Sequence, residues 1–241
     1  MDKQEGVRIN KYIADAGICS RRNADDLTDR GLVKINGEIA TRGMRVMAGD
    51  VVTVDGKTVR PVEDKVYLAY NKPKGITCTA DRSDERNVID HIHYPVRLTY
   101  CGRLDKDSEG LLLLTNDGSI INKMMKASNY HEKEYIVTVD KKVTKGFIRQ
   151  MSEGVYLAEL DETTRECTVE ALDEHVFRII LTQGLNRQIR RMCEALGFRV
   201  TDLKRVRIMN IRLDGLKSGK YRELKGDELR QLLALLQRAH D

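Results

Sequence analysis

The segment from residue 102 to residue 112 holds the densest group of chemically active side chains in the chain. Its sequence is GRLDKDSEGLL, and it runs into four consecutive leucines. A polar loop placed directly before a buried strand holds its side chains rigidly, as a catalytic carboxylate requires. The residue type alone favours a simpler interpretation of Asp105, because aspartate side chains commonly stabilise turns by bonding to nearby backbone. Both interpretations, catalyst and turn former, follow from this segment.

Positive charge is concentrated in one later part of the chain. Residues 183–222 contain eleven Lys and Arg against three Asp and Glu, a local charge of +8, whereas the whole chain has a net charge of +5. Such a stretch is either a solvated helix face next to a basic strand or a surface that binds phosphates. Charge alone does not separate these two interpretations.

Four segments, in chain order, resemble the motifs of the pseudouridine synthases of the RsuA/RluB/RluF group. The sequence GRLDKDSEGLLLLTNDG, which begins at residue 102, resembles the catalytic signature of that group. The other three segments are NKPKGI at residues 71–76, HEKEY at residues 131–135 and GLNRQIRRM at residues 184–192. Together with an N-terminal module, the resemblance covers essentially the full length of the chain.

The resemblance implies a reaction. A pseudouridine synthase breaks the C–N bond between uracil and ribose, turns the base, and joins a ring carbon to the same sugar. No net redox occurs and no group enters or leaves, so the resemblance implies an enzyme without a cofactor. The sequence has no P-loop and no G-x-G-x-x-G segment, which is consistent with that expectation.

Three residues are expected to carry the chemistry. By the resemblance, Asp105 is the essential carboxylate, acting either as a nucleophile at the sugar or as a base toward it. Arg190 is similar to the family's basic partner and would offset the cost of burying that charge, with a bidentate geometry available to it. Tyr135 would stack on the flipped base. The alternatives are a phosphate contact for Arg190 and a core position for Tyr135.

Further basic residues are expected to bind RNA. Lys72, with Pro73, is expected to shape the floor of the pocket, and Arg103 to displace the target base or hold a phosphate. The helix that carries Arg190 offers phosphate contacts through its neighbours, and the basic strand after it would compensate the cost of extruding the uridine. The residues expected in these two roles are Arg187, Arg191, Lys204, Arg205 and Arg207.

The first sixty residues predict a small module of two helices and a hairpin. Ser20 is a candidate cap for the second helix, and Asn36-Gly37 is a hairpin turn signal. The order VRINKYIADAGICSRRNAD, followed by GLVKING, resembles the RNA-binding module that ribosomal protein uS4 shares with several RNA enzymes. By that resemblance Arg21 and Arg22 contact RNA backbone, and the alternative is a pair of ordinary solvated side chains.

The rest of the chain predicts an α+β domain. A polar stretch with a proline at residues 60–64 predicts a boundary between the module, residues 1–62, and a catalytic domain, residues 63–241. Beyond it, strand patterns outnumber helical ones and the turns favour antiparallel pairing. We therefore expect a mixed, mainly antiparallel sheet with flanking helices, the pseudouridine synthase fold. A last amphipathic helix is expected over residues 227–240.

Composition argues against several classes of protein. No apolar run approaches the roughly 20 residues of a membrane span, and the N-terminus lacks the apolar core of a secretory signal. Five cysteines, an odd number without metal-ligand spacing, favour free thiols in the cytoplasm. His91 and His93 alternate as on one strand face, but no third or fourth ligand lies nearby, so we expect no zinc site. We expect a monomer.

Two segments indicate the substrate within the group. RIMNI at residues 207–211 and HEKEYIVTVD are most similar to the RluF type, which modifies large-subunit ribosomal RNA. We therefore expect isomerisation of a uridine in 23S ribosomal RNA. A 16S enzyme of the RsuA type is the closest alternative, and a non-catalytic RNA-binding assembly factor is an alternative of another class. A transfer-RNA stem-loop stays open as a second substrate.

Overall fold

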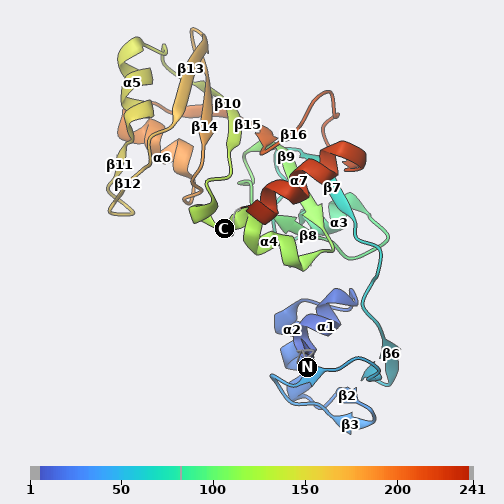
Figure 1. Ribbon diagram of the computed structural model, residues 1–241. Helices are drawn as coiled ribbons and strands as arrows, with labels where there is room; N and C mark the ends of the chain where they lie inside the picture. Colours follow the sequence, from blue (N-terminus) through green and yellow to red (C-terminus); the bar gives the residue numbers. More distant parts are fainter. Residues whose placement is uncertain (1–5, 82, 239–241) are drawn as a thin grey trace. The chain divides into compact units, whose positions relative to one another are not determined.

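A computed structural model gives the structure of the protein and describes residues 6–81 and 83–238. Its elements are shown in Figure 1. The chain divides into two compact units. One runs to Lys65 and includes two later segments, Tyr94–Leu98 and Asn116–Gly118, and the other contains the rest. The single boundary between residues 62 and 63 stays a prediction.

The first unit combines a pair of helices with two small sheets. The helices are α1 (Ile9–Asp15) and α2 (Arg21–Asp29). Strands β3, β2, β5 and β6 pair in that order, and β1 pairs with β4. The bounds of these strands are β1 (Val7–Arg8), β2 (Val33–Ile35), β3 (Glu38–Ile39), β4 (Arg45–Val46), β5 (Val52–Val54) and β6 (Lys57–Val59).

Local sequence signals account for the first unit. Ser20 Oγ accepts a hydrogen bond from the backbone N–H of Asn23 at 3.2 Å, so the predicted cap is confirmed. Asn36 and Gly37 have φ angles of 53° and 88°, the two left-handed residues of a type I′ hairpin turn. Helices and strands share one core of small and aliphatic side chains, which are Ile9, Ile13, Ala24, Val33, Ala40, Val46, Val52, Val54 and Val59.

The second unit is built on one large sheet. In the described residues this sheet has nine strands, and its main path runs β13-β14-β10-β15-β9-β7-β17. Strand β16 pairs with β15, and β8 pairs with β9. The bounds are β7 (Tyr67–Lys72), β8 (Thr99–Cys101), β9 (Glu109–Thr115), β10 (Lys133–Val139), β13 (Thr168–Asp173), β14 (Val176–Leu181), β15 (Val200–Ile208), β16 (Ile211–Arg212) and β17 (Tyr221–Glu223).

Pairing in this sheet is antiparallel with one exception. The described pairs are all antiparallel apart from β9 with β15, which run parallel. The mixed, mainly antiparallel sheet predicted from the sequence is thus confirmed.

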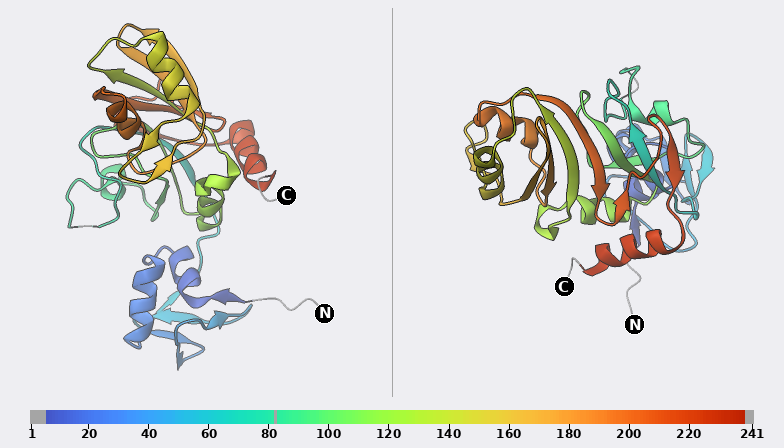
Figure 2. Two further views of the ribbon diagram at one scale, coloured as in Figure 1. Left: turned by 90° about the vertical axis from the view of Figure 1, so that its left-hand side faces the viewer. Right: turned by 90° about the horizontal axis from the view of Figure 1, so that it is seen from above.

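Two groups of helices cover the sheet, as Figures 1 and 2 show. Helices α4 (Gly118–Met125) and α7 (Gly226–Arg238) share a core with β7 and β9, and helices α5 (Lys145–Glu153) and α6 (Gln188–Ala195) share one with β10 and β14. The predicted last helix is confirmed to Arg238, and its final two residues lie outside the described part. No helix within residues 6–81 and 83–238 is long and apolar enough to cross a membrane. The short elements are α3 (Val88–Ile92), the 3-10 helix η1 (Ala127–Asn129), β11 (Tyr156–Leu157) and β12 (Glu162–Thr163).

The two histidines near residue 92 do not lie on a strand. Asn87 caps α3 by accepting a hydrogen bond from Asp90 N at 2.8 Å, so the segment starts a helix. His91 lies in the last turn of that helix, and His93 ends it with a φ of 51°. The predicted strand face is therefore wrong, and His91 Nδ1 instead lies 2.8 Å from the hydroxyl of Tyr70. Among the described residues, no group of three or more His, Cys, Asp and Glu is placed to hold a metal.

The parallel contact between β9 and β15 joins the two halves of the large sheet. It consists of two residue pairs, Lys204 with Glu109 and Arg205 with Gly110. A Cβ atom on Gly110 would lie 2.3 Å from the carbonyl oxygen of Arg205 and 2.7 Å from its nitrogen. The φ angle of Gly110 is 109°, which L side chains rarely adopt. The sheet therefore needs glycine at this position.

Replacing Gly110 by alanine is expected to lower the free energy of unfolding by at least about 2 kcal/mol, because the methyl group meets backbone and the φ angle is strained. Urea unfolding followed by circular dichroism measures this. Gly146→Ala is the control, since Gly146 lies in α5 and its Cβ would meet nothing closer than 3.8 Å. That change is expected to stabilise the helix by up to about 1 kcal/mol. Wild-type stability of Gly110→Ala would contradict the close contact of β9 with β15.

Candidate functional site

The loop between β8 and β9 presents Asp105 on a rigid base. Leu104 and Ser108, on either side of it, are buried, whereas the Asp105 side chain is 33% exposed. Leu104 N donates a hydrogen bond to Cys78 Sγ at 3.4 Å, and Ser108 N donates one to the carbonyl oxygen of Asp105 at 3.1 Å. Buried neighbours therefore hold the Asp105 carboxylate in place at the wall of a pocket.

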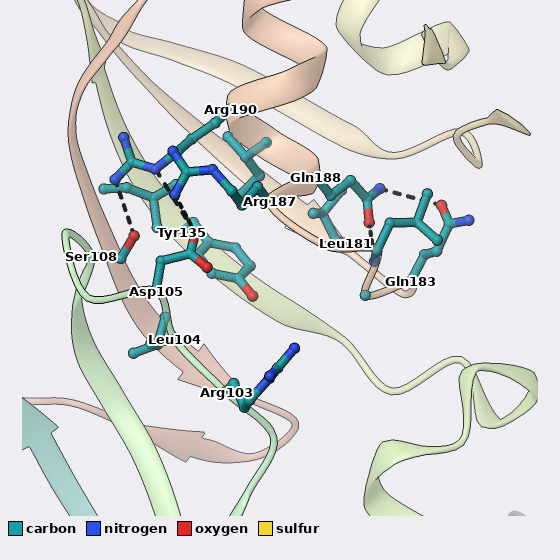
Figure 3. Close-up of a pocket in the computed structure, with 14 residues that line it drawn as sticks. Arg103, Leu104, Asp105, Ser108, Tyr135, Leu181, Gln183, Arg187, Gln188 and Arg190 are labelled. Atoms are coloured by element: carbon teal, nitrogen blue, oxygen red, sulfur yellow. Dashed lines mark hydrogen bonds and ion pairs between the residues drawn. The ribbon is translucent and has the colours of Figure 1, made fainter. Parts of the chain in front are cut away.

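That pocket contains about 470 Å³ of space, its open mouth included. Figure 3 shows Asp105 and Tyr135 next to each other, with Arg187 and Arg190 reaching toward them from α6. The structure thus brings together the three residues expected to carry the chemistry. The apolar walls of the pocket come from Leu104, Leu181, Leu185, Ile189 and Leu203.

Two arginines face Asp105. Arg187 Nη1 lies 3.6 Å from Asp105 Oδ2, and Arg190 Nε lies 3.9 Å from the same oxygen. Both distances exceed those of a hydrogen bond, so the bidentate geometry considered for Arg190 is not adopted. Instead, Arg190 Nη2 donates to Ser108 Oγ at 3.1 Å and to the carbonyl oxygen of Asp107 at 3.3 Å. Arg190 fixes the loop with its hydrogen bonds, and its charge acts on Asp105 through space.

Arg187 is a second cation of the same pocket. Its Nη1 also lies 3.6 Å from Asp107 Oδ1, so it faces two carboxylates of the loop. Its backbone is left-handed, with a φ of 50° and a ψ of 32°, where it begins α6. Such backbone strain in residues other than glycine concentrates at functional sites. Its contact with an RNA phosphate stays a prediction.

Two glutamines that the sequence analysis missed form another wall of the pocket. Gln188 Nε2 donates to Gln183 Oε1 at 3.2 Å, and Leu185 N donates to Gln188 Oε1 at 3.1 Å. Gln183 Oε1 also accepts from Arg165 N at 3.0 Å. Both side chains are buried, so their amide groups are fixed in orientation. Gln188 belongs to the NRQIR motif, but only the structure shows that it turns inward.

A β-bulge in β15 sends two arginines to opposite faces of the sheet. Glu134 pairs with Arg207 and the next residue, Tyr135, pairs with Arg205, which leaves Val206 as an extra residue. Such an extra residue re-aims the side chains around it. The Arg205 guanidinium carbon lies 6.0 Å from the centroid of the Tyr135 ring. On the other face, Arg207 Nε donates to Glu134 Oε2 at 2.7 Å.

The predicted RNA contact of Arg205 is wrong. This residue is only 3% exposed. Its Nε donates to the carbonyl oxygen of Leu111 at 2.7 Å, and its Nη1 donates to that of Arg103 at 3.4 Å. Arg205 therefore ties strand β9 and the start of the Asp105 loop to the strand beneath Tyr135.

The predicted RNA contact of Arg207 stays a prediction, although protein carboxylates hold its charge. Its side chain is 12% exposed and is held by Glu134 and by Glu132, whose Oε2 lies 3.0 Å from Arg207 Nη2. A cation with two carboxylate partners on the protein has little to offer a phosphate. The half-exposed side chain of Lys204 lies 3.4 Å from Glu109 Oε1, and its RNA contact also stays a prediction.

Lys72 is fully buried, so its predicted RNA contact is also wrong. Its Nζ donates to the carbonyl oxygens of Pro73 at 2.9 Å and Ile76 at 2.8 Å, which closes the turn after β7. Burial lowers the pKa of Lys72. The same turn supports the loop that carries Asp105, because Gly75 N donates to the carbonyl oxygen of Lys106 at 2.7 Å. Lys72 thus supports the Asp105 loop indirectly, through the turn that it closes.

The remaining arginines predicted to bind RNA lie on surfaces. Arg103 is exposed and lines the pocket, and Arg21 and Arg22 are exposed in the first turn of α2. Arg191 forms an ion pair with Glu159 and is not among the residues described as lining the pocket. The RNA contacts of these four arginines stay predictions.

Comparison with known proteins decides the family. A family model described as RNA pseudouridylate synthase matches residues 66–195, more than half of the chain. The chain belongs to the RNA pseudouridylate synthase family. An S4 domain model matches residues 7–52 of this pseudouridine synthase. The family and fold predicted from the four motifs and the N-terminal module are therefore confirmed.

Relatives and a solved structure agree with this assignment. The pseudouridine synthase is 50% identical over 233 residues to the dual-specificity RNA pseudouridine synthase RluF of Escherichia coli strain K12, covering 96% of this chain and 80% of that one. It is 37% identical to the ribosomal large subunit pseudouridine synthase B of Bacillus subtilis strain 168, covering 95% and 96%. A crystal structure of a pseudouridylate synthase matches with a TM-score of 0.68 at 30% identity, covering 96% and 100%.

The pseudouridine synthase holds a further, partly buried cation, Lys133, that the sequence analysis did not single out. Lys133 lies two residues before Tyr135 in β10, and alternation along a strand places both on one face. Its Nζ donates to the carbonyl oxygen of His131 at 3.2 Å. Burial, together with the positive charge of Arg205, lowers the pKa of Lys133 from 10.5 to about 8.

This lowered pKa predicts a pH dependence of stability. Between pH 8 and 10.5 the folded protein binds fewer protons at Lys133 than the unfolded chain, so the contribution of this group to stability rises with pH across that window. Below pH 8 the folded protein bears the full cost of the buried charge. Lys133→Met should therefore raise the free energy of unfolding at pH 7 and flatten its rise between pH 8 and 10.5. Urea unfolding at several pH values measures both effects.

Lys142→Met is the control for that experiment. The side chain of Lys142 is 70% exposed and pairs with Glu174 at the surface, so its loss should leave the pH dependence unchanged. An unchanged pH dependence in Lys133→Met as well would show that the Lys133 charge is not buried in solution.

Proposed function

We propose that this protein isomerises a uridine of large-subunit, 23S ribosomal RNA to pseudouridine in the pocket around Asp105. One observation carries the proposal. A single pocket gathers Asp105, Tyr135, Arg187 and Arg190, in a chain whose relatives are named for this reaction. The pocket combines a fixed carboxylate, an aromatic face and apolar walls, which are the groups that this isomerisation needs.

Asp105 acts at the ribose, either as a nucleophile toward its anomeric carbon or as a base that removes a sugar proton. The bond between uracil N1 and ribose C1′ breaks, and the freed uracil turns while Tyr135 keeps it stacked. Uracil C5 is then joined to C1′, as the bond from Asp105 to C1′ breaks in the nucleophilic route or as Asp105 returns the proton to the sugar in the other route. The proton on C5 leaves, and N1 takes up a proton. The product has the same atoms as the substrate, and no electrons are gained or lost, so the reaction needs no co-reactant.

Electrostatics and water exclusion support these steps. The charges of Arg187 and Arg190 offset the cost of holding the Asp105 carboxylate away from bulk water. The leucine and isoleucine side chains of the pocket displace water around the detached base. Arg190 also keeps the carboxylate's loop in one conformation through its hydrogen bonds to Asp107 and Ser108. Fixed groups of this kind reduce the reorganisation needed during the reaction.

The names of the relatives support the choice of substrate. One relative is a large ribosomal subunit enzyme, and another is called dual-specificity. We infer that 23S ribosomal RNA is the principal substrate and that a transfer-RNA stem-loop is a second one. The S4 domain, with Arg21 and Arg22 at the start of α2, would add affinity by contacting phosphates. We propose that the enzyme acts as a monomer in the cytoplasm.

Asp105→Asn is expected to abolish the reaction, because the side chain keeps its shape but loses its charge. In cells that lack the wild-type gene, mapping of pseudouridine in 23S, 16S and transfer RNA should show the sites lost without the protein and restored by the wild type. Asp105→Asn should restore none of them. With purified protein, the single-turnover rate should fall at least about 100-fold, while RNA affinity stays within about threefold.

Asp107→Asn is the matched control. Asp107 lies in the same loop and faces the same two arginines, but it is not among the residues described as lining the pocket. Its change should slow the reaction by less than about tenfold. Near-normal turnover of Asp105→Asn would remove Asp105 from the reaction, and loss of sites in 16S instead of 23S RNA would overturn the proposed substrate.

Tyr135→Phe and Tyr135→Ala are expected to differ. Phenylalanine keeps the stacking face, so RNA binding should stay within about threefold and some turnover should remain. Alanine loses the position of the base and opens the pocket to water, so single-turnover rates should fall at least about 100-fold. Equal damage by both changes in every assay would show that the hydroxyl, and not the ring, is what Tyr135 contributes.

A further inference from the structure

Tyr130 is an exposed aromatic residue in an unusual backbone conformation. Its side chain is 60% exposed, the highest value among the large hydrophobic residues described apart from Ile39. Its φ angle is 52°, a left-handed value that bulky side chains rarely adopt. The chain has twelve aromatic residues, nine Tyr and three Phe, and no Trp, so an aromatic ring placed in solvent needs an explanation.

The neighbours of Tyr130 impose this conformation. Asn129 Nδ2 donates to the carbonyl oxygen of Lys123 at 2.7 Å, and His131 Nε2 lies 3.2 Å from the same oxygen. Both anchors lie at the end of α4, so the residue between them is pushed outward. Strained residues whose surroundings fix them tend to cluster where ligands bind.

Arg165 lies over one face of this ring. Its guanidinium carbon is 4.3 Å from the centroid of the Tyr130 ring, a close cation–π contact. The backbone of Arg165 is also fixed, because the preceding residue, Thr164, is buried and exchanges hydrogen bonds with Val155 at 2.9 and 3.0 Å. The ring and the cation therefore form a preorganised pair.

A further hydrogen bond connects this pair to the pocket. Arg165 N donates to Gln183 Oε1 at 3.0 Å, and Gln183 is a wall of the pocket. On the other side, Tyr130 lies five residues before Tyr135 on the chain that leads into β10. The Tyr130–Arg165 pair thus lies one side-chain contact away from the pocket wall.

We propose that Tyr130 and Arg165 form a stacking platform for an unpaired nucleobase next to the target uridine. This proposal rests on the proposed function, since it takes the Asp105 pocket as the place where the uridine is held. Extruding a uridine leaves its neighbours without a stacking partner. An aromatic face accepts any base, because every base has a π-face, and a cation behind the ring strengthens the contact.

The platform predicts a preference for loops over duplexes. A base within a helix is already stacked on both sides and cannot reach the ring, whereas an unpaired base in a loop or bulge can. Tyr130 should therefore contribute to affinity for a stem-loop and not to affinity for double-stranded RNA of the same length.

Tyr130→Asn tests this directly, because asparagine tolerates the left-handed conformation but removes the ring. Binding is measured with the full chain carrying Asp105→Asn, so that the RNA is not converted. The probes are a stem-loop that the wild-type enzyme converts and a duplex of equal length. Tyr130→Asn should weaken stem-loop binding about tenfold or more and leave duplex binding unchanged. Tyr130→Phe should bind the stem-loop as tightly as the protein that retains Tyr130. Arg165→Met should weaken stem-loop binding by about threefold.

A second set of probes identifies the base. The same stem-loop is made with an abasic site at each loop position beside the uridine in turn. The parent variant carries Asp105→Asn alone. One abasic site should weaken RNA binding by this parent about tenfold, but it should not weaken binding further when Tyr130→Asn is also present. Tyr156→Ala is the control. Tyr156 is exposed to a similar degree, 56%, but its hydroxyl donates a hydrogen bond to Asp161. Its affinity should match that of the parent.

Several results would overturn the platform. They are unchanged stem-loop binding by Tyr130→Asn, equal losses on stem-loop and duplex, and additive losses with every abasic site. The parent variant also separates this inference from the proposed function. Full turnover by Asp105→Asn would refute the assignment of the pocket, whereas an inactive Asp105→Asn with unchanged binding by Tyr130→Asn would refute only the platform.

Discussion

The pocket around Asp105 depends on the close approach of two backbones, that of Gly110 in β9 and that of Arg205 in β15. Strand β9 follows the loop that carries Asp105, and strand β10 carries Tyr135. These two strands do not pair with each other; β15 lies between them and pairs with both. The distance between carboxylate and aromatic ring is thus set by one intervening strand. A side chain at position 110 would push that strand away, which is why glycine there matters to the chemistry as well as to stability.

The bulge at Val206 adds a second constraint to the same strand. Without the extra residue, Arg205 and Arg207 would point to one face, since side chains alternate along a strand. With it, Arg205 lies beneath Tyr135 and bonds to the Asp105 loop through the Arg103 carbonyl, while Arg207 binds Glu134 on the other face. One strand therefore braces both the ring and the carboxylate from inside. Bulges are frequent beside active sites for this reason.

Local signals in the sequence were enough to predict many features of the structure. Features that depend on contacts between distant residues could not be predicted in this way. The Ser20 cap and the Asn36-Gly37 turn follow from neighbouring residues, and the four ordered motifs identified the family. The parallel contact of β9 with β15, the bulge and the buried state of Lys72 depend on residues far apart in the chain, so spacing could not reveal them. The strand face predicted for His91 and His93 was wrong because alternation over three residues does not distinguish a strand from the end of a helix.

The fate of the basic stretch has a consequence for RNA recognition. Most of the arginines that gave residues 183–222 their charge meet protein acceptors: Arg187 and Arg190 face the Asp105 loop, Arg191 pairs with Glu159, Arg205 is buried, and Arg207 pairs with Glu134. Protein acceptors hold these side chains, so they offer fewer free charges to RNA than the sequence suggests. This favours recognition through local contacts, such as stacking on aromatic rings and single phosphate contacts. Stacking depends weakly on salt, whereas counterion release scales with the number of phosphates bound. The platform proposed for Tyr130 and Arg165 is a contact of this kind, and it would let the enzyme select RNA by the bases that a loop exposes more than by its charge.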